Sequence, residues 1–251
     1  MNVRAYVAEF VGTFALVWVG IYSILHFGNV PGGLLGIALA HGLAIALLVT
    51  ATGPVSGGHL NPAITIAVLM TRRIKVVDAL CYIVVQVAAG FAAAAMVGLV
   101  PLYASNEVIG GAETIWQGTP QIRAQLVTAA VEARDTAFSG LILEAIATFF
   151  LVFTVFGSAI DKRAPKVGGL YIGLAVTMGI LAIGPLTGAA LNPARWFGPA
   201  MLGEAVNRTE MSLGWLSFVY VLGPIAGGVI AAWVYQFVMM GRDQLPGKSA
   251  E

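Results

Sequence analysis

The sequence has little of what a soluble protein or a metalloenzyme requires. Only 10% of its 251 residues are charged, against about 25% in a typical soluble domain. One cysteine and three histidines exclude an internal disulfide and make a metal site unexpected. A formal charge of +1 offers nucleic acid no basic surface. No nucleotide-binding or hydrolase motif occurs either, so we expect neither an enzyme nor a bound cofactor.

Apolar residues are what the sequence has in excess, at 59% of the chain. A helix that crosses a bilayer needs about 20 mostly apolar residues, and six stretches qualify. The first carries Glu9 and has a counterpart later in the chain, so we expect a retained span rather than a cleaved signal peptide. The predicted spans are residues 5–26, 34–53, 79–101, 139–160, 168–186 and 213–240.

The second half of the chain repeats the first. The motif Asn61-Pro62-Ala63 recurs as Asn192-Pro193-Ala194, 131 positions later, each time after a Gly-containing approach. The segment 9–14, which begins with Glu9, is echoed by 144–149, which begins with Glu144. Each half has three spans, an odd number, so the second must start from the opposite side of the membrane. Such inverted repeats place a shared site near the midplane, commonly on discontinuous helices.

The repeats define the predicted fold. Residues 61–71 and 192–203 are apolar but too short to span, so each is predicted to be a half-helix. We therefore predict an all-α membrane protein with six transmembrane helices and two half-helices in an inverted repeat. It forms a single domain over residues 1–251, with repeats at about 1–101 and 139–240 joined by an outer loop, 102–138.

The chemistry of Asn-Pro-Ala suits the start of a half-helix. The amide oxygens of Asn61 and Asn192 can cap the first turn, which leaves their NH2 groups free to donate into the space between them. Pro62 and Pro193 suit the first helical position. Two helix N-termini that meet there place two partial positive charges at one point.

The backbone before each half-helix, at 53–60 and 184–191, is predicted to be non-helical and needs polar partners at membrane depth. The carboxylates of Glu9 and Glu144 can accept its N–H groups. We therefore interpret both as structural rather than as proton relays.

Basic residues predict the orientation. With the N-terminus in the cytoplasm, nine basic residues face that side and three the other, so the positive-inside rule puts both termini in the cytoplasm. The short N-terminus and the length favour a prokaryotic inner membrane. The nine are Arg4, Arg72, Arg73, Lys75, Lys162, Arg163, Lys166, Arg242 and Lys248; the three are Arg123, Arg134 and Arg208.

With both motifs in view, the chain resembles the aquaporin (major intrinsic protein) family over nearly its whole length. The residues that carry the likeness are 56–63 and 188–195, together with Glu9 and Glu144. The resemblance implies a homotetramer with one pore per subunit, which passively conducts water or small neutral solutes and excludes protons and ions.

The resemblance also implies a selectivity filter at His41, Ile180, Ala189 and Arg195. Strict water channels of the family place Phe, His and a small residue beside the Arg, and glycerol facilitators place Trp, Gly and Phe there. The set in this chain instead resembles plant tonoplast-intrinsic aquaporins, which are associated with water plus ammonia, urea or hydrogen peroxide. His59 is a further candidate to line the pore.

The residues themselves support a filter of this kind. A charged Arg195 or a mid-span His41 is expensive in a membrane unless it faces a cavity. Ile180 donates no hydrogen bond and Ala189 has little bulk, so we expect a wider and half-apolar constriction. Trp196, where water channels have Ser or Thr, is a departure. A strict water channel or a glycerol facilitator stays an alternative; a coupled transporter would want acidic ion ligands at the midplane.

Overall fold

The computed structural model describes residues 2–100, 102–104, 107–109, 115, 117–121, 133–165, 167–207, 217–241 and 244–246. Six helices in it are long and apolar enough to cross a membrane, which confirms the six predicted spans. Two of them, the fourth and the sixth, end or begin in a π-helical turn, which i,i+4 sequence patterns do not reveal. The six are α1 (Val3–Phe27), α2 (Gly33–Ser56), α4 (Val76–Leu99), α6 (Ala133–Val155) with η2 (Phe156–Ile160), α7 (Gly168–Thr187), and η3 (Phe218–Leu222) with α10 (Gly223–Val234) and η4 (Tyr235–Met239).

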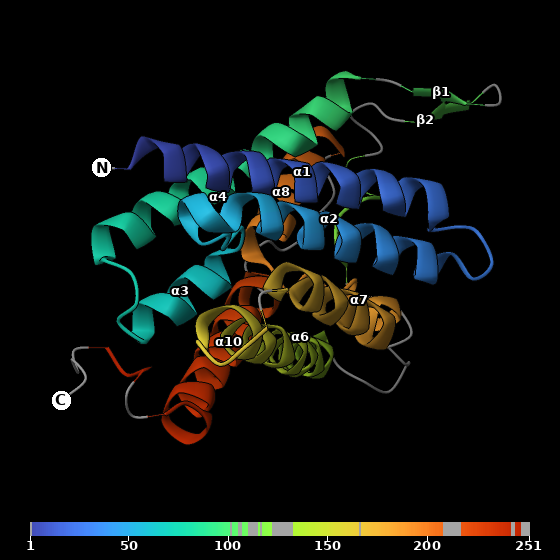
Figure 1. Ribbon diagram of the computed structural model, residues 1–251. Helices are drawn as coiled ribbons and strands as arrows, with labels where there is room; N and C mark the ends of the chain where they lie inside the picture. Colours follow the sequence, from blue (N-terminus) through green and yellow to red (C-terminus); the bar gives the residue numbers. More distant parts are fainter. Residues whose placement is uncertain are drawn as a thin grey trace.

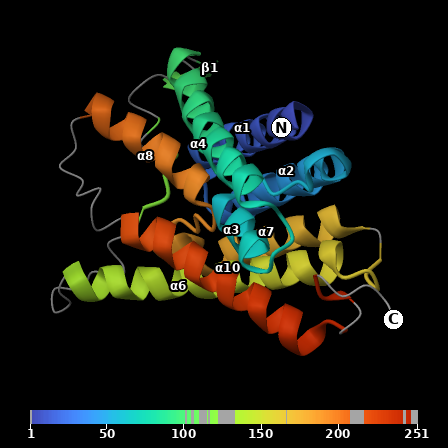
Figure 2. The ribbon, with the colours of Figure 1, turned by 90° about the vertical axis from the view of Figure 1, so that its left-hand side faces the viewer.

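Two shorter helices lie between them, as predicted. α3 (Pro62–Met70) and α8 (Pro193–Asn207) each begin at the proline of an Asn-Pro-Ala motif. They start close together at the centre of the bundle and diverge toward opposite ends (Figure 1). α8 packs against α4, and α3 packs against α10 (Figure 2).

The broken backbone before each half-helix is shorter than predicted. α2 runs through Pro54 to Ser56, and α7 runs through Pro185 to Thr187, so the non-helical stretches begin only at residues 57 and 188. Proline is tolerated within membrane helices because neighbouring groups satisfy the freed backbone. The predicted non-helical stretches, 53–60 and 184–191, therefore began about one turn too early.

The two halves meet most extensively where α2 packs on α7. Gly42 and Gly173, equivalent positions of the two repeats, lie in this contact, and an added Cβ on either would overlap the partner helix. Thr177 Oγ1 donates across the contact to the carbonyl oxygen of Ala38 at 3.2 Å. Small residues here let the backbones approach closely, as in other membrane helix pairs.

The outer connection adds a feature that an all-helical prediction lacks. β1 (Leu102–Ala104) and β2 (Glu107–Ile109) pair antiparallel, with Tyr103 opposite Val108. Further along, Pro120 lies against Gly188, directly before the second motif. The fourth helix begins at Ala133 rather than 139; residues 122–132 of the connection lie outside the described part.

Six basic residues of the described part lie at one end of the bundle. The end where α1 starts and α3 finishes is here called the basic end, and the opposite one, with β1 and β2, the hairpin end (Figure 1). Lys166, Arg242, Lys248, Arg123 and Arg208 lie outside the described residues, as does the side chain of Arg134. The basic end carries Arg4, Arg72, Arg73, Lys75, Lys162 and Arg163.

Candidate functional site

The two Asn-Pro-Ala loops share one backbone conformation. Residues 57, 58 and 60 have positive φ, and so do residues 188, 189 and 191, at the same offset of 131 positions that relates the motifs. Asn61 Oδ1 accepts from the N–H of Ala63 at 2.8 Å, and Asn192 Oδ1 accepts from the N–H of Ala194 at 3.0 Å. Each asparagine therefore caps its own half-helix.

Each asparagine also bonds to the opposite loop. Asn61 Nδ2 donates to the carbonyl oxygen of Leu191 and Asn192 Nδ2 to that of Leu60, both at 2.8 Å. The NH2 groups, predicted to be free to donate into the space between the loops, are therefore each half occupied. Since an amide NH2 has two hydrogens, each asparagine keeps one for a molecule between the loops, and the other ties the two halves together.

Two fully buried carboxylates brace the loops. Glu9 accepts the backbone N–H groups of His59 at 2.9 Å and Leu60 at 2.6 Å. Glu144 accepts those of Ala190 at 2.9 Å and Leu191 at 2.8 Å. Each carboxylate also takes a hydroxyl, from Ser56 to Glu9 and from Thr187 to Glu144, both at 2.7 Å. The loops thus have the polar partners that backbone at this depth requires.

Arg195 and His41 are bonded directly. Arg195 Nε donates to His41 Nε2 at 2.9 Å, and Arg195 Nη1 donates to the carbonyl oxygen of Ala189 at 3.1 Å. His41 Nδ1 lies 2.8 Å from the carbonyl oxygen of Ile37, which can only accept. Nδ1 therefore carries the hydrogen and Nε2 the lone pair, so His41 is the neutral tautomer.

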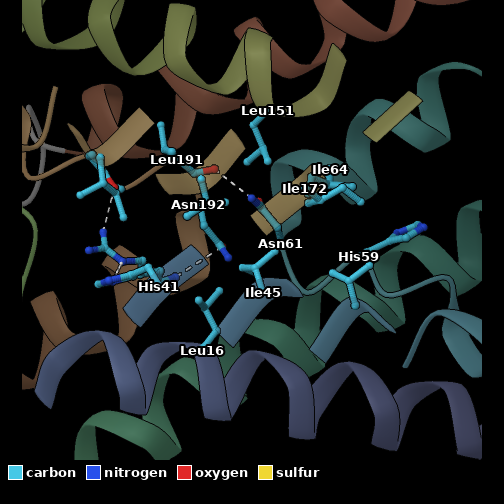
Figure 3. Close-up of a pocket in the computed structure, with 16 residues that line it drawn as sticks. Leu16, His41, Ile45, His59, Asn61, Ile64, Leu151, Ile172, Leu191 and Asn192 are labelled. Atoms are coloured by element: carbon cyan, nitrogen blue, oxygen red, sulfur yellow. Dashed lines mark hydrogen bonds between the residues drawn. The ribbon is translucent and has the colours of Figure 1, made fainter. Parts of the chain in front are cut away.

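These residues line one narrow cavity. His41 lies toward one end and His59 at the other, with Asn61 and Asn192 between them (Figure 3). Its volume is about 20 Å³, close to what a single water needs. The Arg195–His41 pair lies in the lining at one end of this cavity. Its other lining residues are Leu16, Ile45, Val49, Ile64, Leu151, Ile172, Val176, Ile180, Ala189, Ala190, Leu191 and Arg195.

A second cavity, here called the vestibule, adjoins the first at the basic end. It measures about 250 Å³ and shares His59, Ile64 and Ile172 with the narrow cavity. His59 Nδ1 lies 3.2 Å from Thr65 Oγ1, and its ring meets that of Tyr82 edge to face at 5.3 Å. His59 is thus braced on both sides at the junction of the two cavities.

Several residues around the site escaped the sequence analysis. Gln86 donates to Glu9 at 2.8 Å from the middle of α4, and a glutamine inside an apolar span is a signal that could have found it. Arg73 lines the vestibule. The sequence analysis treated it only as a cytoplasmic charge and did not predict that it lines the pore. Trp196 is fully buried and stacks on Tyr220, away from the lining of the narrow cavity. In the described part of the chain no three metal-ligating side chains cluster.

Known proteins show the same organisation. A family model described as major intrinsic protein matches residues 1–235. The probable aquaporin TIP3-2 of Arabidopsis thaliana is 37% identical over 95% of this chain and 85% of its own length. Aquaporin-4 of Mus musculus is 36% identical over 99% of this chain and 71% of its own.

A solved structure shares the fold. The X-ray structure of the aquaglyceroporin from Plasmodium falciparum superposes with a TM-score of 0.75, over 95% of this chain and 97% of that one, at 23% identity. The likeness is therefore one of architecture. Together with the family match and the six apolar helices, it makes the chain a multi-pass membrane protein. The chain belongs to the major intrinsic protein family, and like the aquaporins it is a passive channel for water and small solutes and not an enzyme.

Proposed function

We propose that the chain is a water channel that also conducts ammonia and excludes protons and ions. The observation that carries this proposal is the bonded pair of Arg195 and neutral His41 beside the apolar side chain of Ile180. Asn61, Pro62, Ala63, Asn192, Pro193 and Ala194 form the midplane motif of this pore, and His41, Ile180, Ala189 and Arg195 form its filter.

Water suits the centre of the narrow cavity. A volume of about 20 Å³ has room for about one water. Asn61 and Asn192 each have one amide hydrogen left to donate, and two half-helix N-termini point at the same place. A water there accepts hydrogen bonds from both sides. It then donates outward in both directions, which interrupts a proton wire, while the dipoles and Arg195 oppose cations.

The filter residues have few free hydrogen-bond donors, and this favours the passage of ammonia. Two of the donor groups of Arg195 are already bonded to His41 and to the Ala189 carbonyl, and Ile180 offers none. The constriction therefore replaces less of the hydration of a solute than a ring with two free polar walls. Ammonia is close to water in size and accepts through one atom, so it needs fewer fixed partners. Hydrogen peroxide is the next candidate by width, and urea the last.

Two other functions fit less well. Both oxygens of Glu9 and of Glu144 are occupied by protein donors, so neither offers an ion ligand for a coupled transporter. Glycerol is wider than a cavity with room for about one water. A strict water channel differs from our proposal only in the solutes that it admits.

Parallel stopped-flow measurements on the purified protein in liposomes test the proposal. We expect fast permeation of water and ammonia, and none of ammonium or glycerol. In the double variant His41→Phe/Ile180→His, ammonia permeability should fall about fivefold or more and water permeability about twofold or less, because the filter regains polar walls and bulk. Ammonia flux equal to that of empty liposomes would reduce the function to water alone.

Assembly and orientation complete the proposal. We infer a homotetramer, because the family resemblance implies one; the exposed apolar side chains of α2 (Leu35, Leu39, Leu43 and Leu47) face either lipid or a neighbouring subunit. The basic end faces the cytoplasm of a prokaryotic inner membrane. Labelling with an impermeant thiol reagent tests the orientation: in a Cys81→Ser background, Lys75→Cys should react only in opened cells and Gln117→Cys in intact ones. Native mass spectrometry tests the tetramer.

A further inference from the structure

Arg73 lies where the pore opens at the basic end. It follows α3 directly and lines the vestibule together with His59 and Val68. The vestibule continues into the narrow cavity through shared lining residues. A solute that leaves the Asn-Pro-Ala region toward this end therefore passes one fixed arginine, as a solute at the other end passes Arg195.

The charge of Arg73 is held by neutral groups. Its Nε donates to Gln236 Oε1 at 3.1 Å, and its Nη2 donates to the carbonyl oxygen of Gln244 at 3.0 Å and contacts Met240 Sδ at 2.9 Å. Among the described residues, no carboxylate lies within 4.0 Å of it. Asp161, the acid nearest in effect, is already paired with Arg163 at 2.5 Å. Arg73, Asp161 and Arg163 together therefore carry a net positive charge.

The C-terminal segment sets the position of this arginine. Gln244, nearly fully buried, makes three hydrogen bonds to two loops of the chain. Its carbonyl accepts from Arg73, its Oε1 accepts from the N–H of Lys162 at 2.9 Å, and its Nε2 donates to Asp161 at 3.1 Å. Gln244, which follows the last span, thus links the loop after α3 to the loop after η2.

We propose that Arg73 is a second cation barrier in series with Arg195, and that Gln244 holds it in place. The proposal rests on the proposed channel function. A fixed positive charge at a low-dielectric mouth lowers the local concentration of cations there. Water and ammonia are neutral and do not experience this barrier. Two barriers in series explain how a vestibule as open as 250 Å³ can still discriminate by charge.

Barriers in series predict a particular pattern of leaks. With Arg195 in place, Arg73→Gln alone should admit few cations, because the outer barrier still limits the current. In an Arg195→Val background, only Arg73 and the half-helix dipoles remain. There, Arg73→Gln should raise the potassium and proton leak about threefold or more over Arg195→Val alone.

The experiment measures potassium and proton flux into proteoliposomes, with water flux in the same vesicles. Arg72→Gln in the Arg195→Val background is the matched control. Arg72 is the exposed neighbour of Arg73, carries the same charge and does not line the vestibule, so its loss should leave the leak at the Arg195→Val level. Arg73→Lys should also keep that level, because it retains charge and loses only the fork-shaped hydrogen bonding.

Gln244 is tested in the same background. Gln244→Leu should raise the leak, by less than Arg73→Gln, because the charge survives but its anchor is lost; Leu245→Ala should not. Equal leaks from Arg195→Val with and without Arg73→Gln, in vesicles that still conduct water, would overturn the barrier. A matching rise in Arg72→Gln would also overturn it, since surface charge alone would then suffice. Absence of water flux in the unmodified protein would instead refute the channel.

Discussion

The two Asn-Pro-Ala loops share one backbone, yet their surroundings differ in polarity. Beside the first loop, Glu9 accepts a fourth donor, Nε2 of Gln86, which also donates to Thr65 Oγ1 at 3.0 Å. The position 131 residues after Thr65 is Trp196, and Glu144 has three donors among the described residues. One loop is therefore held in a polar network and the other against an aromatic wall.

The aromatic wall consists of two stacked rings. Trp196 and Tyr220 have ring centroids 5.2 Å apart at an interplanar angle of 24°, and both are fully buried. The indole Nε1 of Trp196 has no hydrogen-bond partner among the described residues. Trp196 does not line the narrow cavity, so this aromatic packing supports the second loop from outside the pore. The polar network, in contrast, adjoins the vestibule through His59 and Thr65.

Substitution of Glu9 or Glu144 tests the carboxylate bracing that the two loops share. In Glu9→Gln or Glu144→Gln, an NH2 group must face one of the two backbone N–H donors. We expect each to destabilise the protein by about 3 kcal/mol or more, because a charge-assisted bond is lost and a buried donor is stranded. Thermal unfolding in detergent measures this. Comparable losses support equal bracing; a stable Glu144→Gln would show that the aromatic wall alone holds the second loop.

Substitution of Trp196 tests the aromatic packing beside the second loop. Trp196→Thr installs the residue type of the first half but removes a large buried side chain, so we expect a loss of about 3 kcal/mol. Trp196→Phe keeps most of the stacking and removes the unpaired N–H, and its cost should be below about 1.5 kcal/mol. If both variants lose equal stability, the indole N–H of Trp196 has a hydrogen-bond partner in the folded protein.

Gln86 is the fourth donor to Glu9, and Glu144 has only three among the described residues. Gln86→Leu leaves Glu9 with three donors, as Glu144 has. We expect a loss of about 1.5 kcal/mol, the value of one bond to a charged group, measured by the same unfolding assay. An unchanged unfolding temperature would mean that the fourth donor is redundant.

The basic end also has an ionisable clamp outside the membrane. Hydrogen bonds from Arg163 above all, with others from Gln244 and Tyr235, hold the pKa of Asp161 well below its usual range. The unfolded carboxylate, with a pKa of about 4, takes up protons before the folded one does. The stability that Asp161 contributes is therefore complete above pH 4 and is lost as the pH falls further.

Comparison of two proteins tests this clamp. From pH 6 to pH 3, the unmodified protein should lose about 1 kcal/mol more than Asp161→Asn, since the variant has no carboxylate to titrate at this site. Parallel losses of unfolding temperature in both would mean that other carboxylates account for the acid sensitivity.

Much of the fold could be predicted because its signals are local or repeated. The six spans follow from apolar length, and α3 and α8 follow from Asn-Pro-Ala before short apolar runs. The helical turns that continue through Pro54 and Pro185 were missed, because in water proline would end them, whereas membrane helices tolerate it.

The contacts that join distant parts of the chain could not be predicted. The bond from Asn61 to Leu191 needs the two loops in register across 130 positions, which no local pattern encodes. The clamp of Arg73 by Gln244 spans 171 positions. The bond from Arg195 to His41 spans 154 positions. The family resemblance grouped these two residues but did not predict that they bond to each other.

A small effect is expected at 58 and 189, the one pair of positive-φ positions at which the two loops differ in residue type. Gly58 has φ of 63°, and its equivalent Ala189 has φ of 46°. Because a side chain in this left-handed region is strained, Ala189→Gly should stabilise the protein by about 0.5–1 kcal/mol. Gly58→Ala should do the reverse and cost more, since its Cβ would lie 3.1 Å from Thr52 Oγ1. Unfolding temperatures of the two variants measure both shifts. If Ala189→Gly destabilises instead, the methyl group of Ala189 contributes packing at the filter that outweighs the strain, and the second loop depends on its side chains more than the first.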